Sequence, residues 1–271
     1  MSINKICANS NCYHGFCIED ALQGIHDAGF KYVELTATKG WTEHIFPNMS
    51  FEYLDNIKML AEKLDLKPIA LSGHCNLMNK KRLLDFENNI KLAHFFECDF
   101  IVTSIGEAHL EDGKKITNEE VVENIKSLLP LLEKCKIILV LEIHGEFSTG
   151  AILESIVKRV NSEWVKINYD TANAIFYGGV DPVEDIENCI ENIAYMHLKD
   201  KAGSDKEWNF PALGEGNIDF SGLFKKLEKH NNCCPLSVEI EFKKNGPKDL
   251  KEVNQAIKDS FQYLEYMHNG R

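Results

Sequence analysis

Four residues whose side chains can bind a metal ion or carry a proton follow one another through the second half of the chain. Each of them ends, or nearly ends, a short apolar run: Glu142, Asp170, His197 and Glu239. A carboxylate at the end of a buried strand is costly to bury alone. Three carboxylates and one imidazole form a donor set that suits a divalent cation. The pattern therefore predicts one shared metal ion, and an enzyme rather than a generic globular domain.

Each residue taken singly also has an ordinary structural explanation. Glu142 would pair with a lysine at the rim, Asp170 would cap a helix, and His197 would be a hydrogen-bonded core residue. Glu239 shares its run with Glu241, and their two-residue spacing places both on one face of a strand. We expect one of these two glutamates to face the site and the other to lie further out. Four such positions on consecutive strands make the separate explanations collectively improbable.

Short apolar runs alternate with longer amphipathic runs along the whole chain, which is typical of strand–helix–strand units. Strands are predicted at 3–8, 31–35, 67–72, 99–103, 137–142, 165–170, 193–198 and 235–240. Helices are predicted at 18–28, 51–64, 81–96, 118–134, 151–160, 182–189, 220–230 and 250–267. Eight such units predict an α/β protein, a single (β/α)8 TIM barrel with residues 1–271 as one domain.

Particular residues mark the ends of these elements and the position of the site. Gly29 ends the first helix, Ser50 is a plausible cap of the second, and Asp181 with Pro182 begins the sixth. Active sites of TIM barrels lie at the carboxyl ends of the strands, where the four predicted metal ligands would meet. The long Gly-rich loop at 199–220 is expected to lie over that opening.

Composition and charge exclude several classes of function. The chain has 271 residues, 44% of them hydrophobic, and a formal net charge of −12, which disfavours nucleic-acid binding. No run approaches the ~18 apolar residues of a membrane span, and the first residues lack the apolar stretch of a signal peptide. The nine cysteines include no Cys-x-x-Cys pair, so we expect reduced thiols, most of them buried, in a cytoplasmic protein.

Five short sequence pieces resemble one known family, the xylose-isomerase-like TIM barrels that are often called sugar phosphate isomerases/epimerases. The resemblance covers nearly the whole chain and is most specific from Glu142 onward. The matching pieces are LEIH at 141–144, YDTAN at 169–173, HLKD at 197–200, LGEGNIDF at 213–220 and SVE at 237–239. Ketose 3-epimerases, hydroxypyruvate isomerase, inosose dehydratase and endonuclease IV belong to that family.

The resemblance implies one divalent metal ion, Mn²⁺ first and Mg²⁺, Co²⁺ or Zn²⁺ as alternatives, held by the four residues named above. It also implies that Glu142 and Glu239 are the catalytic acid/base groups on opposite faces of the substrate. The expected activity is isomerisation or epimerisation of a monosaccharide or keto sugar through a metal-stabilised enediolate. Relatives commonly form dimers or tetramers, so a homo-oligomer is a further expectation from the resemblance.

Five further residues are candidates for binding the substrate. His74 would donate to a substrate hydroxyl or sit in a turn at the rim, and His144, two residues beyond Glu142, would also face the site. Asn173 occupies a position where ketose epimerases have His. Lys199 would face the opening and contact substrate oxygen, although an exposed lysine is the simpler explanation. Trp208 would wall the pocket against water or stack on a sugar ring.

Three other functions compete with isomerisation. An inosose dehydratase-like lyase would remove the same proton and then eliminate water from a keto sugar or keto cyclitol. DNA repair would need more histidine ligands and a basic groove, and a non-catalytic sugar-binding barrel would not need the full ligand set. The chain contains no Gly-rich phosphate cradle, so a phosphorylated substrate is not indicated.

Overall fold

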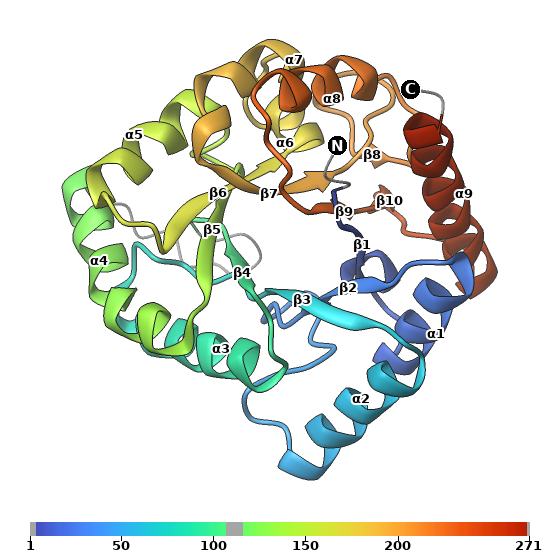
Figure 1. Cartoon of the computed structure of the whole chain (residues 1–271), viewed down its shortest axis with the longest axis horizontal. Helices are drawn as coiled ribbons and strands as arrows, with labels where there is room; N and C mark the ends of the chain where they lie inside the picture. The colour runs from blue at the N-terminus through green and yellow to red at the C-terminus, as the bar shows by residue number, and fades with distance from the viewer. Residues whose placement is uncertain (1–3, 107–115, 270–271) are drawn as a thin grey trace.

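The computed structural model describes residues 4–106 and 116–269, and at its centre is a closed barrel of parallel strands (Figure 1). The barrel strands are β1 (Ile6–Asn9), β2 (Tyr32–Thr36), β3 (Lys67–Ser72), β4 (Phe100–Thr103), β5 (Ile138–Glu142), β6 (Val165–Asp170), β7 (Ile193–Leu198) and β9 (Leu236–Val238). Strand β9 pairs with β1 and closes the sheet, with Cys7 opposite Ser237. The predicted eight-stranded barrel is therefore confirmed.

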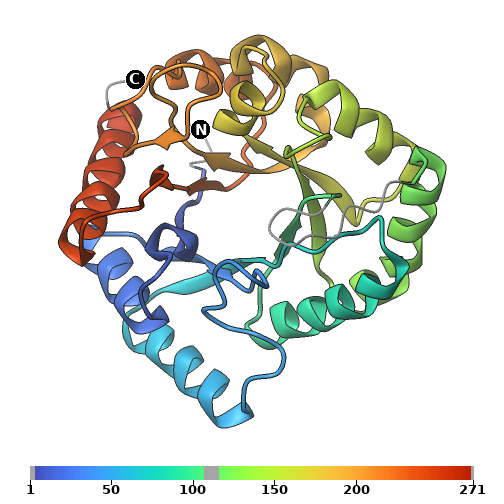
Figure 2. The same ribbon diagram turned by 180° about the vertical axis from the view of Figure 1, so that it is seen from behind.

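Helices form a ring around this barrel in both ribbon views (Figures 1 and 2). They are α1 (Ile18–Ala28), α2 (Phe51–Lys63), α3 (Leu83–Phe95), α4 (Asn118–Cys135), α5 (Gly150–Val160), α6 (Thr171–Phe176), α7 (Pro182–Asp185), α8 (Phe220–Lys229) and α9 (Leu250–Asn269). The predicted caps are confirmed: Gly29 has a φ of 109°, and Ser50 and Asp181 accept from backbone amides of their helices. Among the described residues, no helix is both long and apolar enough to cross a membrane.

The interior of the barrel has an apolar floor and a polar layer above it. Two-residue alternation places Cys7 and then Asn9 inward on β1, and Tyr195 and then His197 inward on β7. Cys7 and Tyr195 pack in one buried cluster with residues of β3, β4 and β5. All nine cysteines are free thiols, and six are buried, as expected. The polar layer lies towards the carboxyl ends of the strands, where the predicted metal ligands lie.

Two features of the fold differ from the expectation. The predicted helix at 182–189 is shorter, because α7 passes into a 3-10 turn at Ile186–Asn188. The loop at 199–220 contains β8 (Asn209–Phe210), which pairs antiparallel with β10 (Phe242–Lys243). In Figure 2, β8 in orange and β10 in red lie side by side beside the barrel. Two-residue strands are too short to give a periodic sequence pattern, which explains why neither was predicted.

Asp200 holds the long loop after β7 in place. Its carboxylate is buried and accepts hydrogen bonds from the backbone amides of Gly214 and Gly216, each at 2.9 Å, and of Ile218 at 3.3 Å. A Cβ atom on Gly216 would lie 2.2 Å from Asp200 Oδ1, so only glycine allows this close approach. The Gly-x-Gly segment at 214–216 is part of a turn before α8.

Replacing Asp200 by alanine is expected to lower the free energy of unfolding by about 3 kcal/mol, because several partly buried amides lose a charged acceptor. Urea denaturation measures this change. Asp205→Ala, which removes an exposed carboxylate from the same loop, is the matched control and should change stability little. A loss below about 1 kcal/mol for Asp200→Ala would show that the loop is held by other contacts.

Candidate active site

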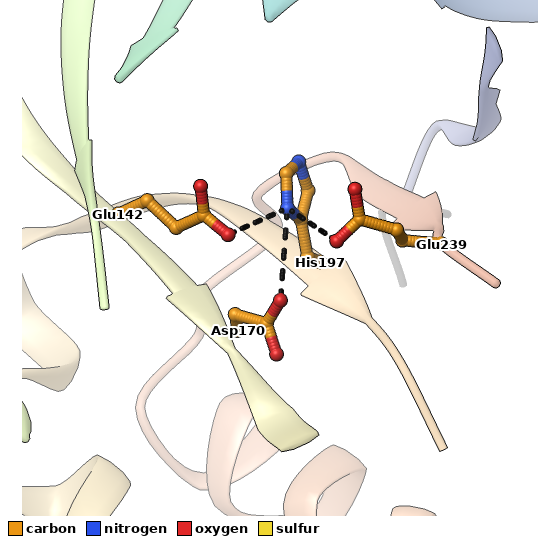
Figure 3. Close-up of side chains that lie close together, drawn as sticks. All are labelled: Glu142, Asp170, His197 and Glu239. Atoms are coloured by element: carbon orange, nitrogen blue, oxygen red, sulfur yellow. Dashed lines mark hydrogen bonds and ion pairs between the residues drawn. The ribbon is translucent and has the colours of Figure 1, made fainter. Parts of the chain in front are cut away.

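The four predicted ligands converge at the carboxyl ends of β5, β6, β7 and β9 (Figure 3). His197 Nδ1 lies 3.3 Å from Glu142 Oε1, 3.4 Å from Glu239 Oε2 and 3.9 Å from Asp170 Oδ2. One ligand atom from each residue lies within 4.8 Å of all the others. Figure 3 shows Glu142 and Glu239 on opposite sides of the imidazole, with Asp170 below it.

This cluster has the properties of a site for a divalent cation. All four side chains are buried, and Asp170 Oδ2 makes no hydrogen bond. Burial raises the pKa of Asp170 well above its ordinary value, and the facing carboxylates add to this although Lys199 opposes it. Three carboxylates that share so small a space repel one another unless a cation lies between them. Oxygen donors with one imidazole fit Mn²⁺, Mg²⁺, Co²⁺ or Zn²⁺.

Neighbouring residues hold the second oxygen of each carboxylate. Asp170 Oδ1 caps α6 by accepting from the amides of Ala172 and Asn173 at 2.9 and 2.8 Å. The helix-cap explanation of Asp170 is thus correct, but it uses only one of the two oxygens. Glu239 Oε1 accepts from the side-chain amides of Asn9 and Asn11 at 3.0 and 3.2 Å. In both residues the remaining oxygen points into the cluster.

Glu34 orients the imidazole from below. It is fully buried, and His197 Nε2 lies 3.0 Å from its Oε1 atom. Its carboxylate also accepts from Ser237 Oγ at 2.7 Å and from the Tyr195 hydroxyl at 3.0 Å. With an ion bound at Nδ1, this pairing would keep the ring proton on Nε2 and direct the Nδ1 lone pair into the cluster. Glu34 lies inside β2, and its side chain points inward, one layer below the opening.

Lys199 is buried inside the site, so the simpler expectation of an exposed lysine was wrong. Its Nζ atom lies 2.8 Å from Glu241 Oε2 and 3.3 Å from Glu239 Oε2, and 4.7 Å from the ring centre of Phe210. Burial alone would lower the pKa of Lys199, but Glu241, Glu239 and Asp170 raise it well above its ordinary value. The amine is therefore charged. Glu241 faces the same cavity as Glu239 and does not lie further out.

His74, His144 and Asn173 surround Glu142 on the other side. His74 Nε2 lies 2.8 Å from Glu142 Oε2, and Asn173 Nδ2 donates to Glu142 Oε1 at 3.3 Å. Burial lowers the pKa of His144 to about 4, so this ring is neutral near pH 7. Its centre lies 4.5 Å from that of the Tyr177 ring. Burial also opposes the ionisation of Glu142, but His74 and His197 lower its pKa well below the ordinary value.

A cavity of about 100 Å³ lies over the cluster. All five predicted substrate-binding residues line it, namely His74, His144, Asn173, Lys199 and Trp208. No sequence motif pointed to several other lining residues, which include Asn11, Thr38, Trp41, Ser72 and Tyr177. Asn11 follows β1, Thr38 and Trp41 follow β2, and Ser72 ends β3, so their place at the ends of predicted strands is the signal that would have found them.

The chain is similar in sequence to one known family and to named enzymes. A family model described as "Xylose isomerase-like TIM barrel" matches residues 22–266. Inosose dehydratase from Geobacillus kaustophilus is 25% identical over 192 residues, which cover 60% of this chain and 62% of that protein. The match thus spans less than two thirds of that relative.

Solved structures show the same fold at lower sequence identity. A xylose isomerase domain protein from Planctomyces limnophilus has a TM-score of 0.79 and 17% identity, with 99% of this chain and 98% of that chain covered. D-Psicose 3-epimerase with D-tagatose, from Clostridium cellulolyticum H10, has a TM-score of 0.79 and 14% identity, with coverages of 97% and 99%. At these identities the likeness concerns the fold alone.

Proposed function

The chain belongs to the xylose isomerase-like TIM barrel family, and from that premise we propose that it is a divalent-metal-dependent sugar isomerase or epimerase. Its substrate would be a monosaccharide or keto sugar. The observation that carries the proposal is the buried set of four ligand atoms within 4.8 Å of one another, with a glutamate on either side. Glu142, Asp170, His197 and Glu239 would hold the ion, with Mn²⁺ as the first choice.

The chemistry divides between the ion and the two glutamates. A bound divalent cation supplies Lewis-acid polarisation of a carbonyl and its neighbouring hydroxyl. Glu142 is ionised, and Glu239 is too: burial opposes its ionisation, but Lys199 and His197 lower its pKa. Either carboxylate is therefore able to accept a proton from carbon. Epimerisation needs proton removal at one face and delivery at the other, which two glutamates on opposite sides of the site would provide.

The lining residues would position the sugar between these two glutamates. His74 and Asn173 keep Glu142 in place and present polar atoms to the cavity, as His144 does. Trp208 contributes an aromatic wall, which suits the apolar face of a sugar and limits the entry of water. Lys199 would keep Glu239 ionised and contact substrate oxygen.

A lyase that removes water from a keto sugar or keto cyclitol is the second candidate. It is favoured by the curated relatives that are named inosose dehydratase. Such an enzyme would remove the same proton next to the carbonyl, and the hydroxyl group on the β-carbon would then leave. The product is an enone, so an absorbance that grows with turnover would separate the lyase from the isomerase.

A screen of ketoses, inososes and 3-keto sugars in D₂O with metal-loaded protein tests the proposed function. We expect exchange of a carbon-bound substrate proton for deuterium, measured by NMR, with or without net conversion. Exchange without conversion still reports proton removal next to the carbonyl. No exchange with any compound of the three groups would contradict the proposal.

Removing the charge of Glu34 is expected to weaken metal binding by about 10- to 100-fold, because Glu34 fixes the ring orientation of His197. Glu34→Gln is the variant, and isothermal titration with Mn²⁺ is the measurement. Tyr195→Phe removes a different donor to Glu34 and is the matched control, with little expected change. Equal affinity in Glu34→Gln and wild type would show that Glu34 is only a structural residue.

The domain organisation, oligomeric state and location stay predictions from the sequence. They are one domain over 1–271, a possible homo-oligomer and a cytoplasmic protein. A small-molecule sugar would be its partner, without nucleic acid or membrane. Light scattering after size-exclusion chromatography would measure the oligomeric state.

A further inference from the structure

The charges around the cavity are unusual for a site that would accept an anionic sugar. Among the described residues that line it, Lys199 is the single lysine or arginine. Three carboxylates line the same space, those of Glu142, Glu239 and Glu241. A site for a phosphate or a carboxylate ordinarily offers several donors or cations that are not already paired.

The one amine in the cavity is already paired. Lys199 Nζ lies 2.8 Å from Glu241 Oε2, and the two side chains are only 4% and 11% exposed. Phe210 lies against the amine on another side, 4.7 Å from Nζ to the ring centre. An anion that takes Lys199 from Glu241 would leave a buried carboxylate unpaired, which is strongly unfavourable.

A bound divalent ion does not reverse this balance. The ion and Lys199 bring three positive charges, whereas Glu142, Asp170, Glu239 and Glu241 bring four negative charges. Buried Glu34 adds a fifth negative charge, so that a protonated His74 would still leave the site negative overall. A neutral polyhydroxyl compound meets no such repulsion, and its hydroxyls match the polar atoms of the lining.

We propose that this cavity selects uncharged ketoses or keto cyclitols over phosphorylated or carboxylated ones, and that Glu241 sets the selection by neutralising Lys199. The inference rests on the proposed function, since it concerns the substrate of the same site. It assigns Glu241 as a specificity-determining residue, although Glu241 is not one of the four metal ligands.

A second groove offers the alternative in which an anionic group is accepted. It measures about 470 Å³, lies along α2 and α3, and shares His74 with the cavity. Lys39, Lys91 and Arg82 line it, and Arg82 Nε lies 2.8 Å from Asp85. If a phosphate reached this groove, phosphorylated and neutral sugars would bind equally well.

Isothermal titration of the Mn²⁺-loaded protein with matched probes tests the inference. The pairs are D-fructose with D-fructose 6-phosphate, and myo-inositol with myo-inositol 1-phosphate. The variants are Glu241→Gln and the double variant Glu241→Gln/Lys199→Gln. Glu215→Gln, which removes an exposed charge from the loop after β7, is the control. If the phosphate contacts the ion directly, that contact is the same in every variant. A difference between variants in the ratio of neutral to phosphorylated affinity therefore reports on the Lys199–Glu241 pair.

We expect the wild type to bind the neutral member at least about tenfold more tightly. Glu241→Gln should reduce that preference by about tenfold, the double variant should restore it, and Glu215→Gln should leave it unchanged. Equal binding of both members by the wild type, or an unchanged preference in Glu241→Gln, would overturn the inference alone. Failure of both neutral probes to bind would overturn the inference, and the proposed function would fall with it if the D₂O screen also showed no proton exchange.

Discussion

Turnover is expected to fall by about a thousandfold or more when either Glu142 or Glu239 is replaced by glutamine. Glutamine keeps the size of glutamate but neither accepts a proton from carbon nor carries the negative charge. Both side chains are ionised and lie on opposite sides of the cluster, so neither replaces the other. The measurement is kcat with a substrate identified by proton exchange in D₂O.

A matched control separates this effect from a general loss of structure. Glu163→Gln removes a carboxylate from an exposed turn before β6 and should keep the wild-type rate. Circular dichroism should show that all three variants are folded. If Glu142→Gln and Glu239→Gln both retained near wild-type kcat, the assignment of these residues as proton carriers would be wrong.

Removal of divalent ions by a chelator is expected to abolish turnover and also to lower thermal stability. A bound ion would relieve repulsion among buried carboxylates in the folded state only. At a free concentration 100 times its Kd, it would stabilise the protein by about 2.7 kcal/mol. For a chain of this size that corresponds to a Tm decrease of roughly 5–10 °C on chelation.

The same measurement on two variants locates the source of the stabilisation. Asp170→Asn removes a ligand charge and should make Tm independent of added Mn²⁺. Asp181→Asn changes an exposed helix cap to another good capping residue and should respond like the wild type. A wild-type Tm that does not change between chelator and saturating Mn²⁺ would argue against an ion within the folded core.

The sequence predicted the barrel and the convergence of its ligands because both depend on local patterns. Each buried parallel strand is a short apolar run, and Glu142 and Asp170 end two such runs. The carboxyl ends of strands in a barrel meet at one opening, so order along the chain was sufficient to bring the four residues together. The family model and the closed sheet confirm the barrel, and the four predicted ligands do lie close together.

Other parts of the site depend on contacts between distant segments, which no local pattern reports. The burial of Lys199 requires Glu241 and the ring of Phe210, and β8 brings that ring into place by pairing with β10. The role of Glu34 is not visible in the sequence, because its position along β2 does not reveal that His197 lies above it. Short polar segments such as the one with Asn11 carry no periodicity at all.

Direct measurement of Mn²⁺ binding tests the central claim, which is that the four side chains share a single ion. The account predicts one Mn²⁺ per chain in the wild type, by titration and by elemental analysis. It predicts an affinity loss of at least about 100-fold in each of Glu142→Gln, Asp170→Asn, His197→Asn and Glu239→Gln. A wild-type protein that binds no divalent ion, or four variants that bind Mn²⁺ as tightly as the wild type, would contradict it.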